Sequence, residues 1–413
     1  MAEILIIGAG IIGLSSAYYL SKQGHQITVI DKGDISDNCS FGNAGMIVPS
    51  HFVPLAAPGM IRQGIRWMFD SKSPFYVKPA LGGGLPAWGI RFLKKSTQRH
   101  VAESAVPLRD LSLLSRKLFE DLAKEPGFDF GLTKNGILAF YKTDKAAEEE
   151  AHLAKRAVEL GLDMAVLSVA ECKALQPMLK LDVLGAVHYR CDAHLYPVKL
   201  MQTLLQYLEK QGVKIVRDHE VTRIDTAGYQ ISAVHTGELV WKADQYVLAA
   251  GSWSPAVARM MGLNVLLMPG KGYSFMEDEP ARRMTIPALL CEARVAITPM
   301  NGQIRYGGTM EIAKINSKVN MNRVKGIVES VPEYFPDLKP ELPVLKDVWY
   351  GFRPSSPDGL PYIGRSAKLH NLVVAAGHGM MGLSLGPATG LLVSQIMTGQ
   401  KTEIDIQAFL PSR

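Results

Sequence analysis

One arginine stands between an aromatic residue and a proline in the segment GFRPSSPDGLPYIGR, residues 351–365. Arg353 has three possible roles: surface charge, a structural ion pair with an acid such as Asp358, or a clamp for a substrate carboxylate. Arginine suits the last role because its planar guanidinium can pair with both oxygens of a carboxylate. The second arginine of the segment, Arg365, is expected to form a salt bridge or to remain exposed.

The N-terminal segment combines an apolar run with a glycine pattern and a later acid. The run at residues 4–7 is continuous, as in a strand buried on both faces, and a helix is expected to follow until about Gln23. A second strand, 26–30, leads to Asp31, whose carboxylate can accept hydrogen bonds from a ribose. The glycines that fit G-x-G-x-x-G are Gly8, Gly10 and Gly13. They permit a tight turn, close approach to a pyrophosphate and close helix–strand packing, so the segment predicts an adenine-dinucleotide site.

A second glycine pattern occurs in residues 372–397, which contain no acid, lysine or arginine. Five glycines, Pro387 and His378 argue against a helix that spans a lipid bilayer. We expect a buried strand, a glycine loop and a buried helix instead. The loop also fits G-x-G-x-x-G, but only about thirty residues remain, with no following strand and acid to hold a ribose. We therefore do not interpret it as a second dinucleotide site.

The nucleotide domain does not continue through consecutive strand–helix units, as it usually would in a nicotinamide enzyme. Strand-like segments instead recur much later, in QGVKIVRDHEVTRI near residue 215 and in DQYVLAAGSWS at 244–254. The second segment ends in small residues that permit close approach to a nucleotide. A discontinuous nucleotide domain of this kind is typical of flavoproteins, which favours FAD over NAD.

Four segments together resemble the FAD-dependent amine and amino-acid oxidoreductases, the family of D-amino-acid oxidase, glycine oxidase and sarcosine oxidase. They are GAGIIG with VIDKGD, VLAAGSWS, GFRPSSPDGLPYIGR and AAGHGMMGLSLGPATG. Four more, CSFGNAGMIVPS, PLAAPGM, SPFYVKPAL and PGKGYSF, resemble the bacterial D-amino-acid dehydrogenase branch of that family. The likeness covers essentially the whole chain. One departure is Asp31, which stands where a glutamate is common at the ribose, a shorter acid that can bind through water.

The resemblance implies an α/β fold with two domains. A discontinuous Rossmann-type FAD-binding domain is expected from residues 1–60, 150–225, 242–260 and 345–413. A second, mostly antiparallel β-sheet domain for the substrate is expected from residues 61–149, 226–241 and 261–344. Strand-like alternation in GILAFYK, ARVAITPM and GQIRYGGTMEI supports the antiparallel sheet.

The resemblance also implies which residues contact FAD. In the N-terminal half they are Gly8, Gly10, Gly13, Asp31, Lys32, Asn43, Ala44, Gly45 and Met46. In the C-terminal half they are Val221, Ala250, Gly251, Trp253, Gly379, Met380, Met381, Gly382, Leu383 and Ser384. The loop 379–384 is expected to lie along the isoalloxazine ring, where its N–H groups and the helix that follows favour negative charge on the reduced ring. A covalent link is not expected, because the sarcosine oxidases that form one carry a cysteine in a C-terminal region and none here follows Cys291.

Matching GFRP to the family places Arg353 at the arginine that binds the substrate carboxylate. Tyrosine is the usual second carboxylate donor in these sites. Tyr273 in PGKGYSF is the first candidate and Tyr306 the second, with a place in the core or the pocket wall as the alternative for both. Arg305 lies on a strand that bears a lysine near the flavin in related oxidases, but the alignment there is too loose to assign it a role.

Three further residues are expected near the substrate. His51 and Met46 follow the early flavin loop and are expected to line the pocket, and Met380 can offer its backbone carbonyl to the substrate amine. His378 has the residue type of a general base, but we interpret it as a support for the glycine loop.

The implied reaction is the oxidative deamination of a D-amino acid, with hydride transfer from Cα to flavin N5 and hydrolysis of the imino acid to a 2-oxo acid and ammonia. Two enzymatic alternatives share the same carboxylate clamp: a D-proline or D-hydroxyproline dehydrogenase, and a glycine, sarcosine or opine oxidase. A flavin-binding subunit without catalysis is an alternative of another class, although Arg353 beside a complete FAD motif argues against it.

The net charge of +6 is concentrated in one part of the 413-residue chain. Residues 62–99 hold eight lysines and arginines and one acid, Asp70, interleaved with six aromatic residues. This composition suits contact with an anionic membrane surface, while a solvated loop and a nucleic-acid site remain alternatives, the last without a recognised binding module. It also favours a quinone as the electron acceptor rather than oxygen.

The remaining composition is that of a globular protein without a metal site. The four cysteines show no metal-type spacing and are interpreted as reduced thiols, so a cytoplasmic location is expected, with possible contact to the inner face of the cell membrane. No cluster of metal-ligating residues stands out, and no metal is expected.

Overall fold

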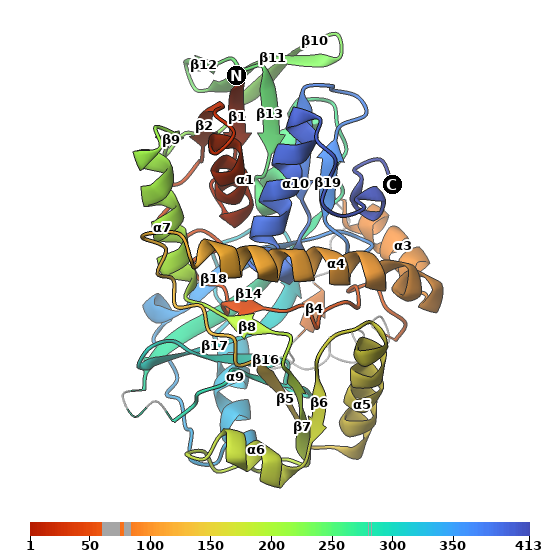
Figure 1. Cartoon of the computed structure of the whole chain (residues 1–413), viewed down its shortest axis with the longest axis vertical. Helices are drawn as coiled ribbons and strands as arrows, with labels where there is room; N and C mark the ends of the chain where they lie inside the picture. Colours follow the sequence, from red (N-terminus) through yellow and green to blue (C-terminus); the bar gives the residue numbers. More distant parts are fainter. Residues whose placement is uncertain (60–74, 78–83, 280, 282) are drawn as a thin grey trace.

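Two β-sheets organise the part of the chain that the computed structural model describes, residues 1–59, 75–77, 84–279, 281 and 283–413. In Figure 1 they lie above and below the long helix α4 (Gln98–Leu122), which crosses the middle of the view. The N-terminus and the C-terminal helix α10 (Gly386–Thr398) both belong to the upper part.

The first sheet has six strands in the order β19-β20-β13-β1-β2-β9. Its neighbouring strands pair in parallel, except that β19 is antiparallel to β20. Parallel strands covered on both faces are built from continuous apolar runs, and the buried β20 has the sequence LVVAA. The strands are β1 (Glu3–Ile7), β2 (Gln26–Ile30), β9 (Lys214–Val216), β13 (Gln245–Leu248), β19 (Tyr362–Arg365) and β20 (Leu372–Ala376).

Different elements cover the two faces of this sheet. On one face, α1 (Ile11–Ser21), α7 (Pro197–Lys210), α10 and the end of α4 share a single apolar core. On the other face lie α8 (Ser254–Met260) and a small antiparallel sheet of β10 (Arg223–Ala227), β11 (Gln230–Thr236) and β12 (Leu239–Trp241). The result is a three-layer Rossmann-type unit, in agreement with the predicted fold class.

The second sheet has nine strands and is mostly antiparallel. Its order is β18-β14-β17-β16-β15-β5-β7-β6, and β4 pairs in parallel with β17. Helices α6 (Val169–Leu175) and α9 (Met321–Tyr334) share an apolar core with one of its faces. The strands are β4 (Phe75–Val77), β5 (Ile137–Tyr141), β6 (Ala165–Leu167), β7 (Gly185–Tyr189), β14 (Met268–Asp278), β15 (Ala288–Leu290), β16 (Val295–Pro299), β17 (Gln303–Ile312) and β18 (Trp349–Ser355).

The remaining elements connect the sheets or extend from them. They are β3 (Met46–Ile47), which pairs with β8 (Ala193–His194), α3 (Leu85–Lys95), α5 (Asp144–Glu159) and the short 3₁₀ helices η1 (Gly251–Trp253), η2 (Leu345–Asp347), η3 (Gly379–Met381) and η4 (Gln407–Phe409). Within the described residues no helix is long and apolar enough to cross a membrane. Residues 372–397 form β20, η3 and α10, as expected from their glycines.

Four segments lie with the other sheet than the sequence led us to expect. Residues 150–189 and 349–355, expected in the FAD-binding domain, lie with the second sheet, where the first range supplies most of α5 and all of β6 and β7 and the second supplies β18. Residues 230–241 and α4, expected in the substrate domain, pack on the first sheet. These assignments depend on which distant surface buries each apolar face, which local periodicity does not encode.

Candidate active site

Two glycines in the turn between β1 and α1 are required by contacts with other backbone atoms of the protein. Gly8 has φ +110°, and a Cβ there would overlap the carbonyl of Ala249. A Cβ on Gly13 would overlap the carbonyl of Gly8, which lets helix and strand approach closely. Gly10 is different, because its Cβ would meet nothing nearer than the Ser40 hydroxyl oxygen at 3.6 Å. The open space before the N-terminus of α1 fits a pyrophosphate.

Asp31 lies at the end of β2, where the pattern placed a ribose-binding acid. Its carboxylate accepts hydrogen bonds from the backbone N–H groups of Ala9 at 2.7 Å and Gly33 at 2.9 Å. These bonds fix the carboxylate beside the glycine turn. The neighbouring Lys32 places its ammonium 3.9 Å from the ring centroid of Trp253, so β2 and η1 meet at this edge of the first sheet.

The early loop carries Asn43, Ala44 and Gly45 and is held in a defined turn. The Asn43 side chain accepts a hydrogen bond from the Gly45 N–H at 2.9 Å, and Gly45 has φ +76°. Ala44 and Met381 both pack against the cluster of Met46, Val48 and Ile137, which joins this loop to the second glycine loop.

The second glycine loop forms η3 and leads into α10. Ser384 accepts a hydrogen bond from the Val48 N–H at 3.0 Å. Leu383 is buried in the apolar core that α1, α7 and α10 share, and Met380 is exposed. His378 pairs its Nε2 with the Thr389 hydroxyl at 3.0 Å, and burial lowers the pKa of His378 to about 3. A neutral histidine bonded to α10 is a support for the loop, as we interpreted it.

Arg353 lies on β18, the strand at the edge of the second sheet. Its guanidinium stacks over the backbone of Gly272, where a Cβ would overlap it, and donates a hydrogen bond to the Thr309 carbonyl. Burial lowers the pKa of Arg353 to about 10, and no carboxylate pairs with it among the described residues. Asp358, the alternative partner, pairs with Arg413 instead, at 2.8 and 3.1 Å.

The sheet face that carries Gly272 and Arg353 also faces the early loop, and we call it the clamp face. Antiparallel partners share a face, so Ser274, Arg305 and Arg353 all lie on it. Ser274 donates to the Gly42 carbonyl at 3.1 Å, and Arg305 donates to the carbonyls of Phe41 and Asn43 at 3.0 and 2.8 Å. The predicted substrate clamp and the predicted cofactor loop therefore meet across this face.

Two contacts that the sequence reasoning missed fasten β18 to the nucleotide domain. Ser252 in η1 donates to the Phe352 carbonyl at 3.0 Å, and the Phe352 N–H donates to the Cys39 sulfur at 3.2 Å. Ser252 and Cys39 lie within VLAAGSWS and CSFGNAG, the segments that carry several predicted FAD contacts, and this placement could have identified them from the sequence. These two hydrogen bonds hold Phe352, the residue before Arg353, against the segments that contain Ser252 and Cys39.

Comparison with known proteins agrees with this geometry. Residues 3–396 match the model of the family described as DAO, FAD dependent oxidoreductase. The chain belongs to this family.

Relatives within the family are similar over the full length. A protein from Granulibacter bethesdensis named D-amino acid dehydrogenase is 31% identical and covers 98% of this chain and 97% of its own, and one from Vibrio vulnificus with the same name is 30% identical with 97% of both covered. Among solved structures, glycine oxidase from Geobacillus kaustophilus has a TM-score of 0.80 at 23% identity, covering 100% of this chain and 98% of its own. L-proline dehydrogenase from P. horikoshii has a TM-score of 0.77 at 20% identity, covering 100% and 97%. These two structures support the fold alone.

As a member of the DAO family the chain is an FAD-dependent flavoprotein, and several predicted contacts lie together. The free space at Gly10, the fixed carboxylate of Asp31 and the N-terminus of α1 form one cradle, with Ala250, Gly251 and Trp253 on the adjacent strand connection. Val221 lies in the core between the first sheet and β10–β12. Its contact with FAD remains a prediction.

The two candidate tyrosines lie on the sheet face opposite the clamp face. Tyr273 and Tyr306 are buried in the core under α9, where Tyr273 accepts a hydrogen bond from the Asn320 N–H at 3.2 Å and Tyr306 stacks on Phe275. Burial raises the pKa of Tyr273 to about 12. The structure does not bring either phenol to Arg353. Tyr273 lies one residue after Gly272, and Tyr306 pairs with Phe275, which lies three residues after Gly272. Because side chains alternate between the two faces of a strand, both phenols lie on the face opposite Gly272 and Arg353.

His51 belongs to a separate polar cluster beyond β3. Its Nδ1 lies 3.1 Å from the Ser50 hydroxyl, which donates to Asp192 at 2.6 Å. Burial lowers the pKa of His51 to about 4 and raises the pKa of Asp192 to about 7. No hydrogen bond joins His51 to Arg353 in the described part of the chain, so its place in the pocket wall remains a prediction.

Arg365 remains exposed, which is one of the two outcomes that we expected, and it forms no salt bridge among the described residues. It donates to the carbonyls of Ile396 and Met397 at 3.0 and 3.2 Å, which lie in the last turn of α10. A cation there satisfies carbonyls that the helix leaves unpaired.

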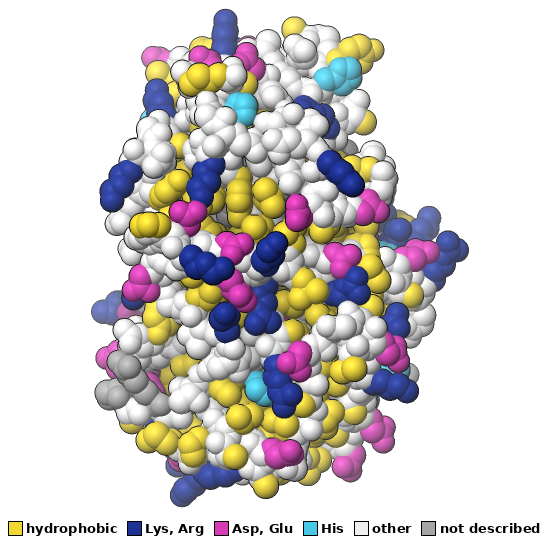
Figure 2. All heavy atoms as spheres, viewed as in Figure 1, with side chains coloured by type: hydrophobic (Ala, Val, Ile, Leu, Met, Phe, Trp, Pro, Cys, Tyr) yellow, Lys and Arg dark blue, Asp and Glu magenta, His cyan; other side chains and the backbone are white. Residues whose placement is uncertain are grey.

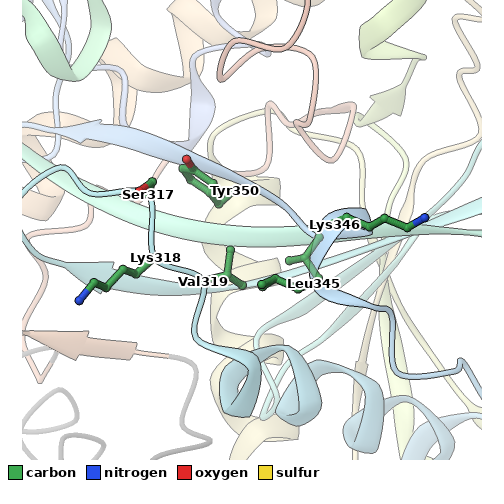
Figure 3. Close-up of a pocket in the computed structure, with 7 residues that line it drawn as sticks. Ser317, Lys318, Val319, Leu345, Lys346 and Tyr350 are labelled. Carbon is green, nitrogen blue, oxygen red and sulfur yellow. The ribbon is translucent and has the colours of Figure 1, made fainter.

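A surface hollow on the second sheet does not belong to this site. Tyr350 on β18 contributes to it, and its partner Tyr273 shows that it points away from the clamp face. Figure 3 shows the residues that line this hollow, Ser317, Lys318, Val319, Leu345, Lys346, Val348 and Tyr350.

Replacing Gly272 by alanine is expected to raise the KM for the amino acid severalfold or more while FAD content stays normal, because the new methyl group displaces the guanidinium above it. Steady-state kinetics and the flavin-to-protein absorbance ratio measure the two effects. Gly307→Ala is the matched control, since its Cβ meets only ordinary contacts at 3.5 Å and beyond. An unchanged KM in Gly272→Ala would show that the guanidinium position does not matter for binding.

Proposed function

We propose that the chain oxidises D-amino acids to 2-oxo acids and ammonia with FAD as the first electron acceptor. The observation that carries the proposal is Arg353, a half-buried guanidinium that has no carboxylate partner among the described residues. It lies on the face that also holds the cofactor loop. The full-length relatives named D-amino acid dehydrogenase support the substrate class and its configuration.

The chemistry requires little beyond orientation and exclusion of water. FAD, when bound, accepts the hydrogen and the electron pair that leave Cα. Arg353 pairs with the substrate carboxylate and so fixes the direction of the Cα–H bond, and the backbone carbonyl of Met380 accepts a hydrogen bond from the amine. The resulting imino acid reacts with water to give the 2-oxo acid and ammonia.

Anaerobic mixing of the purified flavoprotein with a panel of D- and L-amino acids tests the proposal. The yellow flavin absorbance is expected to bleach with D-isomers. Bleaching only with L-isomers would overturn the configuration, and bleaching best with D-proline, glycine or sarcosine would favour the alternatives that share the clamp. No bleaching with any compound would support a non-catalytic flavin subunit. Acid precipitation is expected to release the flavin, as a cofactor held without a covalent bond.

We propose that the electron acceptor is a quinone that the protein reaches at a membrane surface. Among the described elements, helix α3 supports this membrane contact. Residues 60–74 and 78–83, which carry part of the basic segment, lie outside the described residues. One face of α3 packs through Leu85, Trp88 and Phe92. The opposite face presents Ile90 and Leu93 to solvent, 55% and 56% exposed.

Basic side chains flank this exposed apolar face. Arg91, Lys94 and Lys95 are exposed on α3, and the helix contains no acid. Figure 2 shows a cluster of lysine and arginine side chains at the right-hand edge, where α3 projects in Figure 1. An apolar stripe beside cations suits the headgroup region of an anionic bilayer. The inner face of the same helix reaches the clamp strand, because Trp88 donates to the Ser355 carbonyl at 2.8 Å.

Changing Ile90 and Leu93 together to aspartate is expected to abolish sedimentation with anionic phospholipid vesicles, since it charges the apolar stripe and cancels nearby cations. Wild-type binding is expected to weaken as salt rises. Val158→Asp with Val166→Asp, at two other exposed apolar residues, is the matched control and should sediment normally. Equal sedimentation of both double variants would refute α3 as the contact.

A further inference from the structure

The register between strands β14 and β17 shifts by one residue beside Arg353. Lys271 pairs with Glu311, but Tyr273 pairs with Gly308, so Gly272 stands opposite two residues, Thr309 and Met310. This is a β-bulge, in which one strand carries an extra residue. Bulges re-aim side chains and are frequent next to active sites.

Thr309 occupies the strained position of this bulge. Its φ is +63°, in the left-handed region that a β-branched residue rarely adopts. The neighbouring Met310 lies over Gly270, on the clamp face. A glycine at position 309 would adopt this backbone conformation without strain. The presence of threonine there suggests that its side chain has a role that offsets the strain.

The bulge brings Thr309 to Arg353. The Thr309 carbonyl accepts a hydrogen bond from the Arg353 guanidinium. The side chain is only 7% exposed, and its hydroxyl has no hydrogen-bond partner in the described part of the chain. A buried hydroxyl without a partner is unfavourable, and a ligand that supplies an acceptor removes that cost.

We propose that the Thr309 hydroxyl donates a hydrogen bond to the substrate carboxylate held by Arg353. The inference rests on the proposed function, because it assigns a second contact to the same ligand. A carboxylate has acceptor sites beyond those a guanidinium fills, and Arg353 keeps further donors after bonding to the Thr309 carbonyl. Thr309 thereby takes the role that the sequence assigned to a tyrosine, since Tyr273 and Tyr306 lie on the opposite face.

Three substitutions separate the hydroxyl from the backbone. Thr309→Val keeps the shape without the hydroxyl and is expected to raise KM about tenfold or more, as for a lost hydrogen bond to a charged group. Thr309→Ser keeps the hydroxyl and should stay within a few-fold of the wild type. Thr309→Gly relieves the strain but lacks the hydroxyl, so its KM should rise as in the valine variant while its thermal stability does not fall. Thr236→Val, at a buried threonine of β11, controls for loss of a buried hydroxyl and should leave KM unchanged.

Calorimetric titration of the same flavoproteins with benzoate, a carboxylate without an oxidisable Cα–H, supplies a second measurement that does not depend on turnover. The affinity for benzoate should fall in the valine and glycine variants and persist in the serine variant. Wild-type affinity and KM in Thr309→Val would overturn this inference, and weak binding in Thr309→Ser would assign the effect to shape. If Arg353→Lys binds benzoate weakly but Thr309→Val does not, only the inference fails. If Arg353→Lys also binds benzoate normally, another group holds the carboxylate, and the Arg353 clamp of the proposed function fails together with this inference.

Discussion

Arg353→Lys is expected to raise the KM for the amino acid about tenfold to a hundredfold, because a single ammonium cannot replace a guanidinium that pairs with both carboxylate oxygens. The protein should still bind FAD. The guanidinium lies flat on Gly272 with one N–H engaged by Thr309, an arrangement that a lysine cannot reproduce. Steady-state kinetics with a D-amino acid and the flavin-to-protein ratio measure both quantities.

Arg365→Lys is the matched control, since it makes the same change in the same segment but at the end of α10. It is expected to lower stability slightly and leave KM unchanged. Normal substrate binding in Arg353→Lys would show that another group holds the carboxylate.

Gly10→Ala is expected to weaken FAD binding on the order of tenfold or more without harming the fold, because the glycine lets the backbone approach the pyrophosphate. The new Cβ meets only the Ser40 hydroxyl oxygen, at an ordinary 3.6 Å, so the chain itself tolerates it. Purified protein should therefore carry little flavin, yet its flavin-free form should unfold at the wild-type temperature. Titration of flavin-free protein with FAD and thermal unfolding measure the two effects.

One other glycine of the turn and a distant glycine sharpen this test. Gly13→Ala should lower the stability of the flavin-free form, since its Cβ overlaps the carbonyl of Gly8. Gly89→Ala, on α3 with open space around it, should change neither property adversely. Full flavin content in Gly10→Ala would mean that the cofactor does not approach this turn.

Local sequence predicted the parts of the fold whose causes are local. The order from β1 to Asp31 follows from an apolar run, a glycine turn and a second run, and each step spans a few residues. The same holds for β20, η3 and α10, where glycines and Pro387 excluded one long helix. Family membership followed from these segments together, and the match over residues 3–396 confirms it.

The candidate site was predicted only as far as residue type. Arg353 was named as the clamp from its motif, which stays a prediction, and the sequence could not show that Asp358, its alternative partner, pairs with Arg413 instead. Tyr273 lies one residue after Gly272 and Tyr306 pairs with Phe275, and in a strand such an offset decides the face. Residue type cannot reveal which face meets the cofactor loop.

By itself, then, the sequence determined the glycine turns, the candidate clamp arginine and the family, because steric limits on single residues and short periodicities act within a few positions. Tertiary structure alone decided which segments join which sheet, which face carries Arg353, and that a bulge at Thr309 brings its backbone carbonyl to that arginine. Those features arise from strand register between residues far apart in the chain, where a shift of one residue moves a side chain to the other side of the sheet.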